Sequence, residues 1–178
     1  MKTEDIINSC WLRTFTGKVI DPTNVKVSDV DIIDISAALS KLCRYGGHCN
    51  QLYTVAEHCL LVMNLYIKDA KNEYALRSEI LEALLHDASE AYIVDLPTPF
   101  KNLLPEYKNL EDKITKVINK KFKLSNSINY KPYDREALEI EMSVLFDGKE
   151  DNRIKCYSPE TAFALFLSTA LSLMKENK

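Results

Sequence analysis

Glycine and proline are scarce in this sequence, which has four glycines and six prolines among its 178 residues. Sandwiches and barrels need many turns, so their frequent glycines and prolines would be expected here if the fold were all-β. The long segments are instead rich in Leu, Ala, Ile, Glu and Lys, which favour helices. The sequence therefore predicts an all-α fold, and its length fits a single domain over residues 1–178.

The sequence also lacks an excess of positive charge, because 26 acidic residues outweigh 23 Lys and Arg to give a formal net charge of −3. Such a chain has no general attraction for a polyanion, so polymeric nucleic acid is not expected as a partner. The densest basic stretch, residues 116–123, alternates with Ile and Val at helical spacing. We interpret it as a solvated helix face.

No apolar run reaches the ~20 residues that a membrane-crossing helix requires. The longest run, residues 162–174, is predicted to be a buried core helix, and no membrane partner is expected. The start MKTEDIINSC lacks the pattern of a secretory signal. Five cysteines without paired spacing fit a reducing compartment, so we expect a cytoplasmic protein.

Turn-forming residues divide the chain into its predicted elements. Gly17, Asp21, Pro22 and Asn24 predict a short extended or hairpin segment within residues 11–30. Pro97 and Pro99 predict a stiff loop. Helices are predicted over residues 31–43, 53–70, 73–92, 105–122, 132–146 and 159–175.

Two polar features fall within segments that otherwise look like core. His58 shares a helical stripe with Val55, Val62 and other apolar residues, and the pair His86-Asp87 directly follows apolar residues 83–85. Burying an imidazole beside a carboxylate costs several kcal/mol unless a metal, a charge partner or hydrogen bonds compensate. A shared cation would compensate for it. Taken singly, His58 also fits a satisfied core histidine, and His86-Asp87 fits an exposed ion pair or cap.

Three sequence strings resemble one known family. They are Val-Ala-Glu-His at residues 55–58, Leu-His-Asp-Ala-Ser-Glu at 85–90 and Asp-Leu-Pro-Thr-Pro-Phe-Lys at 95–101. Together they resemble bacterial and phage HD-domain phosphohydrolases, especially the 5′-deoxynucleotidases, and are similar to phage triphosphohydrolases that act on dATP. The resemblance covers residues 11–146. It implies an HD-domain helical bundle, a homo-oligomer, and the cytoplasm of a bacterium or of a phage-infected host.

The resemblance also implies one catalytic divalent metal ion. His58, His86 and Asp87 match its first three ligands, and Asp134 best matches a fourth ligand near the start of a later helix. Two imidazoles and two carboxylates suit Mn, Co, Fe, Zn or Mg. The alternatives for the fourth ligand are Asp147 and Asp151. A structural zinc site is a rival use of Cys43, His48, Cys49, His58 and Cys59, although their spacing matches no zinc knuckle.

By the same resemblance, Glu90 is the acid or base of catalysis and Asp95 is a second catalytic or sugar-contacting carboxylate. Substrate contacts are expected from the short segment before the His58 helix and from one lysine. These candidates are Arg44 and His48 for phosphate, Tyr45 for stacking on a base, and Lys101 for phosphate. Arg44 also fits a helix-end charge, His48 a turn residue and Tyr45 a core aromatic, and Lys101 is the weaker phosphate candidate.

The expected reaction is release of phosphate from deoxynucleoside 5′-monophosphates by metal-activated water. One alternative is a deoxynucleoside triphosphohydrolase of the dATP type, which releases triphosphate. Another is a nucleotide-binding module without turnover, which would lack a ligand or Glu90, and all of these are present.

Overall fold

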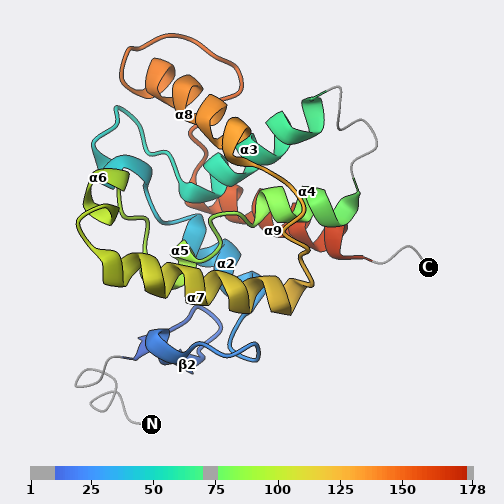
Figure 1. Cartoon of the computed structure of the whole chain (residues 1–178). Helices are drawn as coiled ribbons and strands as arrows, with labels where there is room; N and C mark the ends of the chain where they lie inside the picture. The colour runs from blue at the N-terminus through green and yellow to red at the C-terminus, as the bar shows by residue number, and fades with distance from the viewer. Residues whose placement is uncertain (1–10, 70–75, 176–178) are drawn as a thin grey trace.

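A small β-hairpin opens the described part of the computed structural model, which comprises residues 11–69 and 76–175. Strand β1 (Leu12–Arg13) pairs antiparallel with β2 (Val19–Ile20). Gly17 lies in the turn with φ +87°, a backbone conformation that glycine adopts at little cost. The hairpin is anchored because Ile20 is buried in the main core. The predicted N-terminal hairpin is therefore confirmed (Figure 1).

The rest of the described chain is helical or loop, which confirms the all-α prediction. Short 3-10 turns occur at Pro22–Asn24 and Arg44–Gly47. None of the helices within the described ranges is long and apolar enough to cross a membrane. The helices are α2 (Ile32–Leu39), α3 (Val55–Lys68), α4 (Arg77–Leu84), α5 (Glu90–Ile93), α6 (Thr98–Lys101), α7 (Pro105–Phe122), α8 (Lys131–Leu145) and α9 (Pro159–Met174).

Helix α3 lies at the centre of the fold and packs against α4, α8 and α9. Thr54 begins it with a capping box, in which the Thr54 side chain accepts from the Glu57 amide and the Glu57 side chain accepts from the Thr54 amide. One side of α3 joins the main core with α2, α4 and α9, and another joins a smaller core with α8. His58 is completely buried on this helix. Because both cores hold α3, the position of His58 is closely fixed.

The predicted helix over residues 73–92 is wrong in its middle. Helix α4 ends at Leu84 and α5 begins at Glu90, with a run of turns at 85–89 between them. Here the amides of Ala88 and Glu90 donate to the carbonyls of Leu85 and Asp87, each three residues back, instead of four. His86-Asp87 therefore lies in a tight turn. Residues 73–75 lie outside the described ranges.

The other predicted helices agree with the structure to different degrees. Those over 105–122, 132–146 and 159–175 correspond to α7, α8 and α9. Helix α2 is shorter than its predicted range 31–43, and α6 includes Pro99, where only loop was expected, because the first turn of a helix does not need the missing N–H. The expected burial of 162–174 holds for one face only, since Leu165, Leu171 and Met174 are exposed.

Candidate metal site

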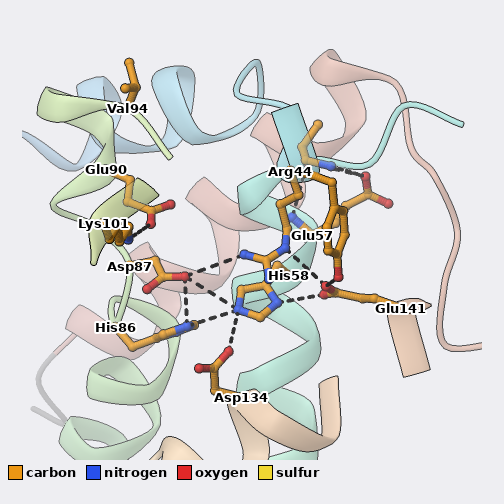
Figure 2. Close-up of polar contacts among 12 residues, drawn as sticks. Arg44, Glu57, His58, His86, Asp87, Glu90, Val94, Lys101, Asp134 and Glu141 are labelled. Atoms are coloured by element: carbon orange, nitrogen blue, oxygen red, sulfur yellow. Dashed lines mark hydrogen bonds and ion pairs between the residues drawn. The ribbon is translucent and has the colours of Figure 1, made fainter. Parts of the chain in front are cut away.

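Three segments far apart in the sequence bring the four predicted ligands together (Figure 2). His58 comes from α3, His86 and Asp87 from the turn after α4, and Asp134 from the first turn of α8. The Nε2 atom of His58 lies 3.2 Å from Nε2 of His86 and 3.1 Å from Oδ1 of Asp134. Oδ2 of Asp87 lies 3.5 Å from Nε2 of His58 and 3.1 Å from Nε2 of His86.

The partners of the other ring nitrogens determine what the two imidazoles present to this site. Nδ1 of His86 lies 2.9 Å from the carbonyl of Ala83, which can only accept, so Nδ1 carries a proton. Nδ1 of His58 lies 2.7 Å from Oε1 of Glu141, whose pKa is about 2, so it also donates. If both imidazoles are neutral, each Nε2 atom then carries a lone pair and no proton, and the two lone pairs face each other beside two carboxylates. Such a cluster favours the binding of positive charge, either a proton or a cation.

Distances and charge within the cluster fit a metal ion. Ligand atoms bound at ~2.0–2.2 Å to one ion lie about 3 Å apart when they are neighbours around it. Burial opposes ionisation of Asp87, yet His86, His58 and Arg44 hold its pKa well below the ordinary value. The pKa of Asp134 is lowered as well, against the effect of burial, mainly by His58. Both carboxylates are therefore available as anionic ligands.

The raised pKa of His86 also shows that the cluster favours positive charge. Burial disfavours the charged form of His86, but Asp87 and then Cys59 raise the pKa of His86 well above its ordinary value. A proton thus binds where a cation is needed. A divalent ion would satisfy the same lone pairs and carboxylates without requiring an imidazolium.

Glu141 orients His58 and was not predicted from the sequence. It is fully buried on α8 and accepts hydrogen bonds from Nδ1 of His58 at 2.7 Å, the Tyr45 hydroxyl at 2.6 Å and Nε of Arg44 at 3.1 Å. These partners outweigh burial and lower its pKa to about 2. A carboxylate behind a ligating imidazole fixes its tautomer and ring orientation. The spacing offered a signal, because Glu141 follows Asp134 by seven residues, two helical turns.

Arg44 and Tyr45 reach the cluster from the short 3-10 turn before α3. Besides its bond to Glu141, Arg44 places Nη1 3.9 Å from Oδ2 of Asp87. Tyr45 has φ 58°, and its ring packs edge-on against Phe146 at 5.1 Å between centroids. Both side chains thus serve internal contacts here, and their roles toward a substrate stay predictions.

Glu90 and Lys101 form a second polar group beside the cluster. Glu90 is buried, and its Oε1 accepts from Nζ of Lys101 at 3.0 Å. Lys101 also donates to Glu111 at 2.8 Å. Oε2 of Glu90 is buried and has no hydrogen-bond partner among the described residues. Burial and then the charges of Asp87 and Asp95 raise the pKa of Glu90 to about 9, while Lys101 opposes the rise.

Asp95 follows an unusual backbone turn at Val94. Val94 has φ 69° and ψ 161°, a region that β-branched residues rarely adopt. The Tyr107 hydroxyl donates to the Val94 carbonyl at 2.6 Å and so holds this turn from α7. Asp95 is half-buried; burial raises its pKa, Arg44 opposes this and Asp87 adds to it. Asp95 therefore lies within the electrostatic field of the cluster.

Some predicted residues lie elsewhere. His48 is exposed, and its backbone amide donates to the Tyr45 carbonyl at 3.1 Å. Asp147 and Asp151, the alternative fourth ligands, pair with Lys149 at 3.8 Å and Arg153 at 2.6 Å. Of the three candidates for the fourth ligand, Asp134 is the one that contacts His58.

The rival zinc site is not assembled in the described chain. The described residues contain two groups that could hold a metal, His58 with His86 and Asp134, and Cys59 with His86 and Asp87. Cys43 and Cys49 belong to neither group, and the Cys49 thiol donates to the Gln51 carbonyl at 3.0 Å. Of the cysteines in the rival set, only Cys59 therefore lies beside the cluster.

Comparison with known proteins gives relatives but no family. No protein-family model matches the chain. It is 41% identical over 114 residues to the uncharacterized protein YfdR of Escherichia coli K12, and 33% identical over 117 residues to an uncharacterized protein of Rhodobacter capsulatus. Each match covers 64% of this chain and 59% of the relative. The chain thus spans less than two thirds of the length of these curated relatives.

Proposed function

We propose that this protein is a metal-dependent phosphohydrolase that releases phosphate from deoxynucleoside 5′-monophosphates. One observation carries the proposal: the Nε2 atoms of His58 and His86 lie 3.2 Å apart, and the carboxylates of Asp87 and Asp134 lie beside them. The resemblance to HD-domain phosphohydrolases supports it. A cytoplasmic location, in contact with the nucleotide pool, is part of the same proposal.

The four side chains would hold one divalent cation. Their two nitrogens and two oxygens suit Mn, Co, Fe, Zn or Mg, because no thiolate in this set selects for a soft metal. When bound, such an ion lowers the pKa of coordinated water and neutralises charge on a phosphoryl oxygen. The chain's contribution is to keep both imidazoles in the required tautomer through Glu141 and the Ala83 carbonyl.

Glu90 is the side chain best suited to move a proton. With a pKa of about 9, it carries a proton at neutral pH, and its Oε2 has no partner in the described chain. It can therefore protonate the leaving oxygen of an ester and then accept a proton from water. Lys101 holds the other oxygen of the same carboxyl group and keeps it in place. Arg44 and Lys101 supply positive charge for a phosphate, and Asp95 a second carboxylate.

The test is release of phosphate or polyphosphate from a panel of deoxynucleoside mono- and triphosphates, with several divalent metals. Asp87→Ala should lose both bound metal and activity. Glu90→Ala should lose activity and keep its metal. Asp112→Ala, which changes an exposed aspartate on α7, is the control and should resemble the wild type.

The panel also separates the alternatives. Release of triphosphate alone would replace the proposal with a triphosphohydrolase. Nucleotide binding without product, under all metals, would leave a binding module. Equal activity of the two site variants and the wild type would show that the mechanism is wrong.

A further inference from the structure

A cavity lies beside α3, apart from the metal site. Its volume is about 490 Å³, within the range of small-molecule sites. Its walls are α3, the segment 152–157 and α9. The α3 wall is the stripe Glu57, Leu61, Asn64 and Lys68, spaced at three to four residues. His58 is the next residue after Glu57 and points about 100° away around the helix, so the cavity and the metal site use adjoining faces of one helix.

Positive charge gathers on this cavity although the chain as a whole is acidic. Lys68, Arg153 and Lys155 line it. Arg153 is paired with Asp151 at 2.6 Å and Glu136 at 3.6 Å, whereas Lys68 and Lys155 have no ion pair among the described residues. The charge of Lys68 also acts on the Asp151 carboxylate, but neither ammonium group is held in an ion pair within the described chain. A concave site with charge of one sign attracts a ligand of the opposite sign.

One carboxylate, that of Glu57, also lies in the cavity wall, but its oxygens are directed at donors within the protein. Glu57 is buried, and its Oε1 accepts from the Tyr157 amide at 2.8 Å. Its Oε2 accepts from the amide and hydroxyl of Thr54, both at 3.3 Å. Both oxygens are therefore used within the protein, and burial raises the pKa of Glu57.

The remaining lining is apolar with a few hydrogen-bonding groups. Leu61, Leu65 and Leu165 line it together with two tyrosines, and Asn64, Asn152 and Thr169 add amide and hydroxyl groups. An apolar lining with a small number of placed polar groups is typical of a small-molecule site. The aliphatic and aromatic walls suit a flat apolar body, and the lysines suit an anionic group attached to it.

We infer that this cavity binds a small organic anion, with an aromatic body between α3 and α9 and its phosphate, sulfonate or carboxylate on Lys68 and Lys155. The site shares no lining residue with the metal cluster, so it stands whether or not the proposed hydrolase activity is found. The side chains that recognise the ligand come from segments far apart in the sequence, which meet only in the folded chain.

The test uses the full chain and the fluorescent sulfonate 8-anilinonaphthalene-1-sulfonate, with a chelator present so that a metal ion cannot hold the probe. We expect one saturable site. The double variant Lys68→Glu/Lys155→Glu should weaken binding about tenfold, since each of these exposed charges contributes up to ~1 kcal/mol. The matched control, Lys116→Glu/Lys120→Glu on exposed α7 positions, has the same charge change and should bind as the wild type.

A second variant tests the cavity without changing charge. Asn64→Trp places an indole at the wall of α3 and should abolish probe binding; circular dichroism and thermal melting verify that each variant is folded. Phenyl phosphate should compete with the probe. If both lysine pairs weaken binding equally, or if a folded Asn64→Trp variant binds like the wild type, the probe lies elsewhere and the inference is overturned. If Asn64→Trp alone affects binding, the cavity does not select an anion, and the inference also fails.

Discussion

Two buried glutamates on opposite sides of the metal cluster have opposite acidities. Glu141, on the α8 side, accepts hydrogen bonds from three side chains, and its pKa is about 2. Glu90, on the α5 side, accepts a hydrogen bond only from Lys101 within the described chain. Its Oε2 has no partner there, and its pKa is about 9. Both are nearly inaccessible to solvent. The difference comes from their neighbours, since cations and donors surround Glu141, while Asp87 and Asp95 lie near Glu90.

The two glutamates therefore suit different roles, Glu141 a structural one and Glu90 a chemical one. A fully satisfied carboxylate stays ionised and fixes the ligand His58 in one orientation. A carboxyl group with an unused oxygen and a raised pKa keeps a proton that it can give away. Substitutions at the two glutamates and at Val94 test this difference.

Glu90→Gln should have the largest effect on activity. The amide keeps the size of the side chain but cannot transfer a proton, so kcat should fall by about 10²–10⁴-fold. Bound metal, measured by elemental analysis, should be unchanged. Glu111→Gln, at the other partner of Lys101, is the matched control and should keep most activity. An equal loss in both variants would show that Lys101, and not Glu90, is the important group.

Glu141→Ala should have the largest effect on stability. It leaves His58 and Arg44 without their buried partner, which should lower the free energy of unfolding by about 3–5 kcal/mol in urea titrations. Metal affinity should fall by about 10–100-fold because the imidazole is no longer held. Glu139→Ala on the same helix removes an exposed pair with Arg135 and should change stability by under ~0.5 kcal/mol. Similar stability of the two variants would contradict the structural role.

The two glutamates should also act at opposite ends of the pH range when a chelator removes metal. Because folding raises the pKa of Glu90 from 4.5 to about 9, its contribution is fully present below pH 4.5 and is lost as the pH rises toward 9. Glu141 has a lowered pKa, so its contribution is present above pH 4.5 and is lost as the pH falls toward about 2.

Urea titrations across the pH range measure this difference. Between pH 4.5 and 9, the wild type should lose on the order of 3 kcal/mol relative to Glu90→Gln, which is less than the full shift because water can enter the site. Glu111→Gln should follow the wild type. Parallel curves for wild type and Glu90→Gln would mean that Glu90 is ionised in the folded protein.

Val94→Gly should have the smallest effect. Glycine adopts φ 69° and ψ 161° without the side-chain clash of valine, and this gain of ~1–3 kcal/mol exceeds the ~0.5–1 kcal/mol entropic cost of glycine. A net gain of about 1 kcal/mol in unfolding free energy is expected. Val94→Ala keeps a β-carbon in the same conformation and should gain less. A glycine variant less stable than the alanine variant would show that Val94 is unstrained.

Helix α3, which carries His58, was predictable because its apolar stripe and its capping residues indicate the same helix. His58 shares the stripe of Val55 and Val62, and the structure buries all three on α3, whose start is fixed by Thr54 and Glu57. Residues 105–122 were equally clear, since Pro105 starts α7 and apolar residues recur along one face. For Asp134, its place in the first turn of a helix was expected from the sequence and is confirmed.

The break between α4 and α5 was not predictable from the same kind of signal. Residues 83–90 contain neither glycine nor proline, and Ala, Leu and Glu favour a continuous helix. Glu141 was missed because a single glutamate on an amphipathic helix is usually solvated, and only the partners brought by α3 and the turn at Arg44 explain its burial.

The helical class, the N-terminal hairpin and the inward direction of His58 follow from the sequence, because periodicity and capping depend on neighbours along the chain. Only the tertiary structure decided that α3, the turn at residues 85–89 and the start of α8 meet at one point. It also decided which carboxylate is satisfied and which keeps a free oxygen. Both depend on contacts between residues far apart in sequence, whose distances and dielectric surroundings exist only after the helices have packed.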